Sequence, residues 1–347
     1  MDDAKLMQSP EFSMNRRAML GRCGMGLGAL GLTALLHDEG LLGETNPLRS
    51  KTPHFLGKAK SVIWIFVNGG PSQVDTWDYK PALEKMDGKT MEGFDRFTGF
   101  FANAVGGLMK SPFEFTRRGE CGKPVSEIFP YLGEHVDKMS FIHSGHTESN
   151  NHSPALFMMN CGVPRMGFPC AGSWATYGLG SSSKDLPAFV VMSDPLGRGL
   201  PKGHAANWGA GFLPSVYQGT YFRPKGDPID NLHRPKEHDL SRQRRQLDLM
   251  SNLNRMDLNR NPFEQELAAR IESFELAYRM QSSAPEALNI SSEPEYLKNL
   301  YGLNQTKSKH FAAQCMMARR LVERGSRFVQ ISSGGMANQR SWDGHSD

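Results

Sequence analysis

The chain has 347 residues, enough for one large α/β domain or two smaller domains. It carries 40 basic and 36 acidic residues, and this nearly balanced charge of +4 argues against nucleic acid or an anionic membrane as a partner. The five cysteines show no Cys-x-x-Cys spacing, which argues against a zinc knuckle.

The N-terminus has the pattern of an export signal. Arg16 and Arg17 precede a glycine-rich, weakly hydrophobic segment at residues 23–36, which is shorter than the about 20 residues of a membrane-spanning helix. We predict that residues 1–40 form a twin-arginine signal peptide, and that the protein is periplasmic or extracellular with no integral membrane segment in its mature chain. A buried amphipathic helix with a chance arginine pair is the alternative. The polar residues 41–58 are expected to be a linker.

The most informative stretch follows this linker. Residues 61–67 are almost all apolar, β-branched or aromatic, which predicts a strand buried on both faces of a parallel sheet. The run stops at an Asn-Gly-Gly-Pro turn, residues 68–71, and Asp75 and Asp78 come next. Polar groups just beyond the carboxyl end of a central strand lie where open α/β sheets bind ligands. A strand, a turn and an acidic loop without chemistry would give the same pattern.

Periodicity and turn residues predict the remaining elements. We expect, in chain order, a short helix at 81–86, a long loop packed by its aromatic residues at 87–121, an amphipathic helix at 125–135, a strand at 139–143, a helix at 154–161 and a strand at 186–192. The series continues with a glycine-rich binding loop at 197–222, helices at 233–258, 262–280 and 307–324, and a strand at 327–332. This alternation predicts one α/β domain over residues 59–347, with a doubly wound, mostly parallel sheet and helices on both faces.

The sequence ends soon after the last predicted strand. Its final residues, 342–347, read Trp-Asp-Gly-His-Ser-Asp and have the composition of a ligand-binding cluster. A domain does not normally finish at such a cluster without a covering element. We therefore interpret the sequence as a fragment or as the product of a truncated gene.

Three groups of polar residues each follow a predicted strand. They are Asn68 with Asp75 and Asp78, the histidines at positions 143, 146 and 152, and Asp343 with His345. A parallel sheet would bring all three groups to one edge, and carboxylates with imidazoles suit zinc or another divalent transition metal. Such an ion could polarise a phosphoryl or sulfuryl oxygen. Asp343 and His345 could equally be ordinary turn residues.

Ser153 has two interpretations. It could cap the predicted helix at 154–161, with Pro154 in the first turn, and capping is the commoner use of serine at such a position. The same position is where a nucleophile would feel the helix dipole, which favours anionic substrates.

Several motifs taken together resemble one family. They are the twin-arginine leader, WIFVNGGPSQVDTWDYKP at 64–81, NHSPALFMMNCG at 151–162, NWGAGFLPSVYQGT at 207–220 and WDGH at 342–345. With these motifs, residues 14–347 resemble the exported domain-of-unknown-function family 1501, which is grouped with the alkaline phosphatase and sulfatase superfamily. The resemblance implies an alkaline-phosphatase-like α/β core, a two-metal site and a nucleophile at a helix N-terminus.

The resemblance also implies metal ligands. By position, Asp343 and His345 match the superfamily's late Asp/His metal pair. Asn68 stands where the early metal aspartate usually lies, directly after the first strand, and Asp75 is the nearest carboxylate.

The chain departs from the sulfatase pattern in its signature helix. His152 holds the place of the modified cysteine, and Ala155 and Leu156 replace the Ser-Arg pair, which argues against sulfatase chemistry. Family members usually continue with Gly-Glu-Phe-Gly-Arg-Thr-Pro and Gly-Arg-Asp-His segments. This chain lacks both, so the resemblance implies that the C-terminal part of the domain is missing.

These observations lead to a hypothesis about function. We expect an exported, metal-dependent, sulfatase- or phosphatase-like hydrolase that acts on a phosphate or sulfate ester of a small molecule or a polysaccharide. The expected catalytic residues are His152 and, as the alternative nucleophile, Ser153; the expected ligands of a divalent metal, zinc or calcium, are Asp343, His345, Asp75 and Asn68. The alternative is an inactive relative that serves as a binding or surface-assembly module. A third hypothesis is a polysaccharide-binding protein that uses the aromatic loop around Trp208, Tyr217 and Tyr221.

Overall fold

The computed structural model describes residues 46–93, 106–143, 145–149, 151–194, 196, 200–223, 228–229, 232, 239–260, 265–334 and 342. The chain divides into two units, Met1–Asn46 and Pro47–Asp347, and the elements below belong to the second. The predicted signal peptide at 1–40, Asp343 and His345 all lie outside the described residues. Within the described residues, no helix has the length and apolar character needed to cross a membrane.

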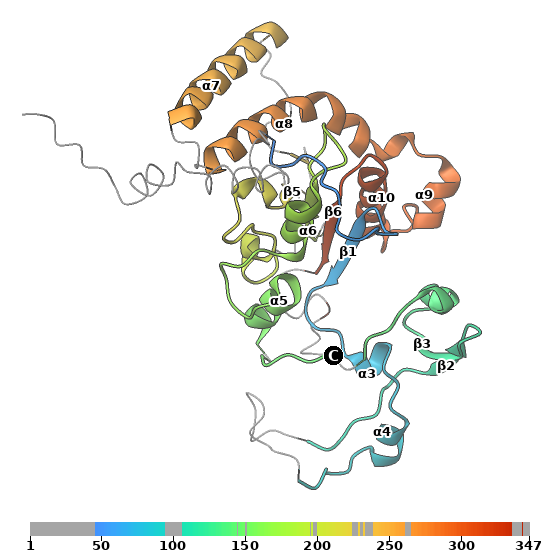
Figure 1. Cartoon of the computed structure of the whole chain (residues 1–347). Coiled ribbons are helices and arrows are strands. Elements are labelled where there is room, and N and C mark those ends of the chain that lie inside the picture. Colours follow the sequence, from blue (N-terminus) through green and yellow to red (C-terminus); the bar gives the residue numbers. More distant parts are fainter. Residues whose placement is uncertain are drawn as a thin grey trace, which may run out of the picture. The chain divides into compact units, whose positions relative to one another are not determined.

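A four-stranded sheet lies at the centre of the larger unit (Figure 1). Its strands, in spatial order, are β1 (Val62–Val67), β6 (Phe328–Ser333), β4 (Phe189–Met192) and β5 (Thr220–Phe222). Every pairing in this sheet is parallel. The predicted α/β class and the predicted strands at 61–67, 186–192 and 327–332 are therefore confirmed.

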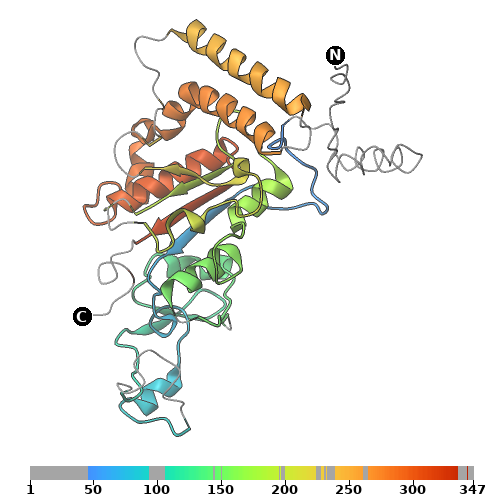
Figure 2. The same cartoon turned by 90° about the vertical axis from the view of Figure 1, so that its left-hand side faces the viewer.

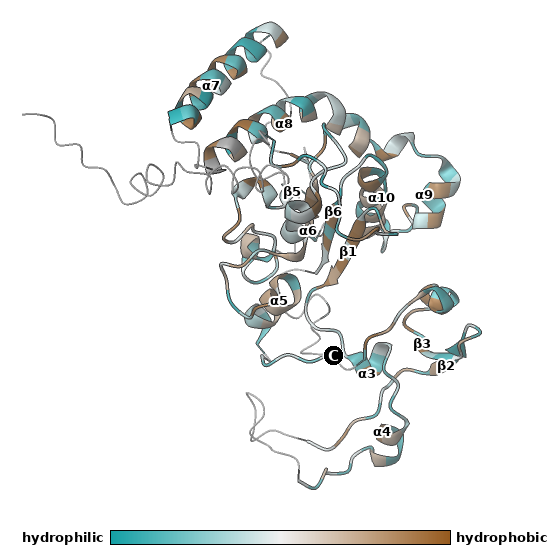
Figure 3. Cartoon of the chain, viewed as in Figure 1, coloured by the Kyte–Doolittle hydropathy of each residue, from teal (hydrophilic) through white to brown (hydrophobic). Residues whose placement is uncertain are grey.

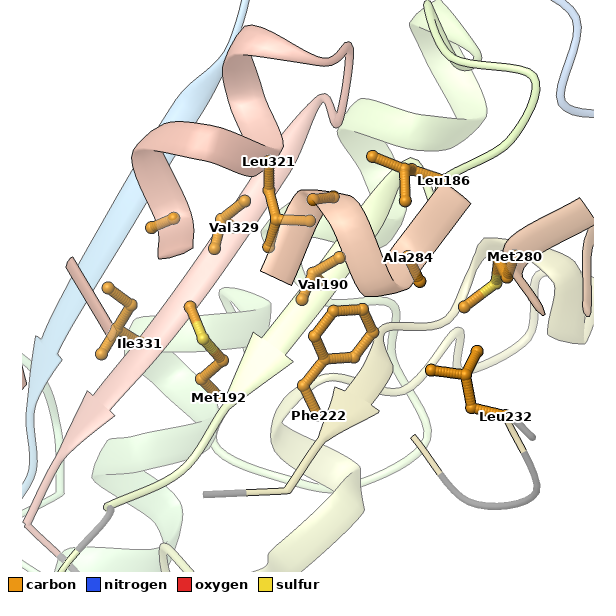
Figure 4. Close-up of a cluster of buried hydrophobic side chains, with 12 residues drawn as sticks. Leu186, Val190, Met192, Phe222, Leu232, Met280, Ala284, Leu321, Val329 and Ile331 are labelled. Atoms are coloured by element: carbon orange, nitrogen blue, oxygen red, sulfur yellow. The ribbon is translucent and has the colours of Figure 1, made fainter. Parts of the chain in front are cut away.

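The two faces of the sheet bury different side chains, because successive residues of a strand point to opposite sides. On one face, Val190, Val329 and Ile331 pack with Ala284 of α8 (Gln265–Leu288) and Leu321 of α10 (Lys309–Glu323), as Figure 4 shows. The opposite face carries a second core, which lies against α6 (Ala171–Leu179) and consists of Cys170, Phe189, Val191, Trp208 and Phe328. Both cartoon views place α8 and α10 on one side of the sheet and α6 on the other (Figures 1 and 2).

In the part of the chain that the structure describes, β1 is an edge strand, and the prediction that it is buried on both faces is wrong. Among the described strands it pairs with β6 alone. Val62 and Ile63 are each 40% exposed and Ile65 is 52% exposed, so the apolar run coloured in Figure 3 lies partly at the surface. A continuous apolar run predicts a strand but does not say how many neighbours that strand has.

The segment between β1 and the next predicted helix differs most from expectation. β2 (Phe115–Arg118) and β3 (Lys123–Ser126) form an antiparallel ribbon, followed by the 3-10 helix η2 (Leu132–Lys138). The predicted helix at 125–135 and strand at 139–143 are therefore wrong. Pro130 interrupts the helical pattern. Trp77 stacks on Phe129 at a ring-centroid distance of 4.8 Å. The aromatic residues of this segment therefore pack with one another beside the ribbon.

Most of the predicted helices are present. The predictions at 81–86, 154–161 and 307–324 correspond to α4 (Pro81–Met86), α5 (His152–Cys161) and α10, and the two long charged segments form α7 (Leu240–Arg260) and α8. Other short helices were not predicted: α3 (Gln73–Thr76), α6, η3 (His204–Asn207), η4 (Ser215–Tyr217), η5 (Ile290–Ser292) and α9 (Glu295–Tyr301). α6 has a tertiary cause, because a Cβ at Gly172 would lie 2.5 Å from the ring of Phe189. The glycine that weakens α6 is thus what lets it approach β4.

The described cysteines are free thiols of unequal exposure. Cys121 is exposed, whereas Cys170 is buried and Cys161 and Cys315 are half-buried. Burial raises the pKa of Cys161 to about 12 and that of Cys315 to about 11, and it also raises the pKa of Cys170. At pH 8 roughly one Cys161 thiol in ten thousand is a thiolate, the reactive form.

We therefore expect one fast thiol in the folded protein. On a Cys23→Ser background, a chromogenic disulfide reagent at pH 8 reacts with a single thiol, and denaturant releases three more. Cys121→Ser removes the fast phase and leaves the slow one unchanged. A fast thiol that remains in the Cys121→Ser variant would contradict the burial described here.

Candidate functional site

The carboxyl ends of β1, β4 and β6 meet at one edge of the sheet, because the three strands run in the same direction. Asn68 directly follows β1, and its backbone N donates to the Ser333 carbonyl at the end of β6 at 2.8 Å. On the other side of β6, the Gly334 backbone N donates to Asp194 Oδ2 at 2.9 Å. Both Asn68 and Asp194 are buried. We call this place, with Asn68, Asp194 and residues 332–334, the carboxyl edge.

Asp194 is a residue of this edge that the sequence prediction missed. Its Oδ1 accepts from the Leu196 backbone N at 2.8 Å, so both carboxylate oxygens accept hydrogen bonds from the backbone. The carboxylate thus ties the loop after β4 to the loop after β6. The rule that selected Asn68, a polar residue directly after an apolar strand, also selects Asp194, because the strand predicted at 186–192 ends two positions earlier.

A buried hydroxyl at the same edge lacks a protein partner. Ser332 is almost fully buried, and its Oγ has no hydrogen-bond partner within the described residues. Buried polar atoms are normally satisfied, so a group of this kind calls for an ordered water or a ligand. Ser332 lies one position before the strand end at which Asn68 and Asp194 meet.

A chain of buried amides fixes α5 against the sheet. Gln330 of β6 donates through Nε2 to Asn160 Oδ1 at 3.4 Å. Asn160, in the last turn of α5, donates to Asn207 Oδ1 of η3 at 3.3 Å and to the Leu156 carbonyl at 3.0 Å. Networks of this kind are rigid when every member is satisfied. The position of α5 relative to β6 is therefore set by side chains far from its first turn.

The first turn of α5 carries His152 and Ser153, both half-buried. The helix is capped by Asn151, whose Oδ1 accepts from the Ser153 backbone N at 3.3 Å. The prediction that Ser153 is the cap is therefore wrong, and the hydroxyl of Ser153 is not used for capping. The partial positive charge at this end of the helix favours an anionic group beside it.

Asp75 and Asp78 belong with the ribbon. Asp75 lies on α3, which contacts β3. Asp78 Oδ2 pairs with Lys80 Nζ at 2.9 Å, and its Oδ1 lies 3.7 Å from His143 Nδ1. The structure thus brings Asp78 and His143, which come from two of the three predicted groups, to one place.

Lys123 of β3 completes this cluster. Its Nζ hydrogen-bonds His143 Nε2 at 2.7 Å and lies 4.5 Å from the ring centroid of Phe141. Burial lowers the pKa of Lys123 in spite of the nearby Asp78 carboxylate. The third histidine of the predicted group, His146, is exposed.

The described residues alone do not fit a metal ion. Among them, no three or more histidine, cysteine, aspartate or glutamate side chains are grouped to hold one. Asp343 and His345, the predicted metal pair, lie outside the described residues. Trp342, which directly precedes Asp343 in the sequence, donates through Nε1 to Ser333 Oγ at 3.2 Å. The described residue next to the predicted metal pair therefore lies at the end of β6.

The three aromatic residues predicted to bind polysaccharide are not arranged as an exposed surface. Trp208 and Tyr217 are buried, and Trp208 stacks on Tyr221 at a ring-centroid distance of 5.9 Å. The hydroxyl of Tyr221 hydrogen-bonds Ser193 Oγ. These three rings hold the 201–222 segment on the sheet, so the prediction that Trp208 and Tyr217 contact a polysaccharide is wrong.

The comparisons with known proteins give one match. Residues 59–347 match the model of a family described as "Protein of unknown function (DUF1501)". No curated protein and no solved structure matches the chain.

Proposed function

The chain belongs to the DUF1501 family, and we propose that it is an exported, metal-dependent hydrolase-like enzyme of the alkaline phosphatase superfamily. Its substrate is a phosphate or sulfate ester, and its active site is the carboxyl edge. One observation carries the proposal: hydrogen bonds at the ends of β1, β4 and β6 bring together Asn68, Asp194 and Trp342, which are far apart in the sequence. Open α/β sheets bind their ligands at this kind of edge.

The residues at this edge suit an anionic ester. The first turn of α5 is proposed to face this edge, where its partial positive charge would attract the ester oxygens and stabilise the charge that builds up on them. Either Ser153 Oγ, which would give up its proton to water, or a neutral ring nitrogen of His152 would bond to the phosphorus or sulfur atom as the bond to the alcohol oxygen breaks, and the alcohol would take up a proton from water. A second water would then hydrolyse the covalent intermediate, which releases phosphate or sulfate and restores the nucleophile. A divalent ion, zinc or calcium, would neutralise part of the ester's negative charge. Asp343 and His345 would hold this ion, and Asn68 and Asp75 are further candidate ligands.

The experiment is metal analysis combined with a panel of chromogenic esters. We expect the purified protein to retain a divalent metal and to hydrolyse at least one nitrophenyl phosphate or sulfate, with activity lost on chelation. One of the variants His152→Ala and Ser153→Ala should lose about a hundredfold or more in kcat. His146→Ala, an exposed histidine a few residues earlier, is the matched control and should keep wild-type activity.

The same experiment contains the result that would remove the proposal. A protein that folds, retains no divalent metal and turns over no ester in the panel is not a hydrolase of this class.

A second candidate is an inactive relative that serves as a binding or surface-assembly module. The half-exposed apolar side chains of β1 favour it, because an open edge strand can pair with a strand of another chain. His152→Ala separates the two candidates. If the protein is a binding module, His152→Ala leaves the affinity for the ester unchanged and there is no turnover to lose. If it is an enzyme, the same replacement lowers the rate of ester turnover.

A further inference from the structure

A continuous row of aromatic rings crosses the outer side of α6. The rings are Phe168, Phe212, Trp174, Tyr177 and Tyr217, and successive ring centroids lie 6.1, 5.8, 6.0 and 5.3 Å apart. We call this set the aromatic row. Trp174 is 45% exposed, Tyr177 39% and Phe212 64%, so three of its rings face solvent. Each neighbouring pair meets edge to face, a geometry that aromatic rings prefer.

The row is held rigidly in place. Trp174 and Tyr177 are on α6, and Phe212 is on a loop that is fastened to the start of the same helix. The Gly209 carbonyl of that loop accepts from the Cys170 backbone N at 3.2 Å and from Ser173 Oγ at 3.0 Å. Gly211 has a positive φ of 59°, and a Cβ there would lie 2.3 Å from the Phe168 carbonyl carbon. Because these rings are fixed before any ligand arrives, little entropy is lost when one binds.

The charge around the row is positive. Lys51 Nζ lies 5.0 Å from the ring centroid of Tyr177, and the Arg165 guanidinium lies 5.2 Å from that of Phe168. The two cations therefore flank opposite ends of the row. Neither of the segments that supply the rings, residues 149–184 and 195–226, contains a single aspartate or glutamate.

We propose that the aromatic row binds a sulfated or carboxylated polysaccharide. The exposed rings of Trp174, Tyr177 and Phe212 present faces and edges in turn. They pack against the C–H groups of successive sugar rings, which a line of rings on a rigid surface can follow along a polymer. The ammonium of Lys51 and the guanidinium of Arg165 pair with sulfate or carboxylate groups at the two ends. An anionic polymer fits this surface because the ring-bearing segments carry no carboxylates that would repel it. A neutral polysaccharide would form no ion pairs with the two flanking cations.

This inference does not rest on the proposed hydrolysis. The aromatic row lies on α6 and its adjoining loop, and its ligand is recognised by stacking and charge without any bond being broken. A protein that turns over no ester can still bind through the row, and the two proposals can therefore fail separately.

The test measures the affinity of the full chain for heparin, alginate and neutral dextran, by calorimetry or affinity electrophoresis. We expect binding to heparin, alginate or both, weaker binding at high salt, and no measurable binding to dextran. Trp174→Ala and Phe212→Ala should each weaken binding by about tenfold or more. The matched control is Tyr296→Ala on α9, a ring that is 69% exposed and far along the chain from the row.

Charge is tested separately from the rings. Arg165→Gln replaces an exposed side chain, so it should leave thermal stability unchanged while it weakens binding and reduces its salt dependence. The proposal is overturned if the wild-type chain binds neither anionic polysaccharide, as expected of a face that docks another protein. It is also overturned if Trp174→Ala, Phe212→Ala and Arg165→Gln all bind like the wild type.

Discussion

Under the proposed function, we expect Asp343→Ala and His345→Ala each to lower ester turnover by about a thousandfold and to reduce the metal content of the purified protein. The reason is that this pair supplies the main metal ligands in the proposed site, and the adjacent Trp342 donates to Ser333 Oγ at the end of β6. Loss of a ligand leaves the metal too weakly held to stabilise a developing negative charge. Metal content by mass spectrometry and kcat/KM on the best chromogenic ester are the two measurements.

The matched control for this prediction is Asp347→Asn. Asp347 is a carboxylate of the same terminal segment, and it lies outside the Asp-x-His pair. The Asp347→Asn variant should retain both the bound metal and the ester-hydrolysing activity. Full activity in Asp343→Ala and His345→Ala would show that the pair consists of ordinary turn residues, which was the other interpretation of the sequence.

Arg320→Met is expected to cost about 3 kcal/mol of unfolding free energy, because Arg320 is a buried cation with several partners. Its side chain, on α10, is 6% exposed. Its Nε donates to the Ala287 carbonyl at 2.9 Å, and its Nη2 donates to the Glu286 carbonyl at 2.8 Å. Its Nη1 pairs with Glu293. Methionine fills similar space but leaves these acceptors at the end of α8 without their donor.

A second arginine on the same helix provides the control. Arg324 pairs with the same Glu286 carboxylate at 2.7 Å, but its side chain is 30% exposed. Arg324→Met should cost less than about 1 kcal/mol, as surface ion pairs usually do. Urea unfolding of the three proteins measures both values. Equal losses in the two variants would show that burial of Arg320 is not what matters.

The fold was predictable where local patterns are strong. The apolar runs at 61–67, 186–192 and 327–332 gave real strands because each is bounded by turn residues, and Pro81 marks the start of α4 in the position where helices tolerate proline. The edge position of β1 was not predictable, because the run in its sequence would suit a central strand equally well. α6 depends on the contact of Gly172 with Phe189, which no local pattern reveals.

The candidate site was predictable in outline. The rule that polar residues follow strands correctly placed Asn68 at the sheet edge, and the same rule applied to the strand at 186–192 would have added Asp194. The predicted group of histidines does not stay together, because the exposed His143 lies beside Asp78 at the ribbon whereas His152 starts α5. The rings of Trp208 and Tyr217 were misread as a surface, since composition alone does not distinguish a buried aromatic ring from an exposed one.

The central claim is that one oxyanion site lies at the carboxyl edge. Tungstate has the shape and charge of sulfate, and its anomalous scattering locates it in a crystal without ambiguity. Crystals soaked in tungstate should show the strongest peak beside Asn68 and the first turn of α5, with Asp343 and His345 on the same side of the sheet. A peak elsewhere, together with Asn68 and His345 on opposite sides of the molecule, would contradict the proposed active site.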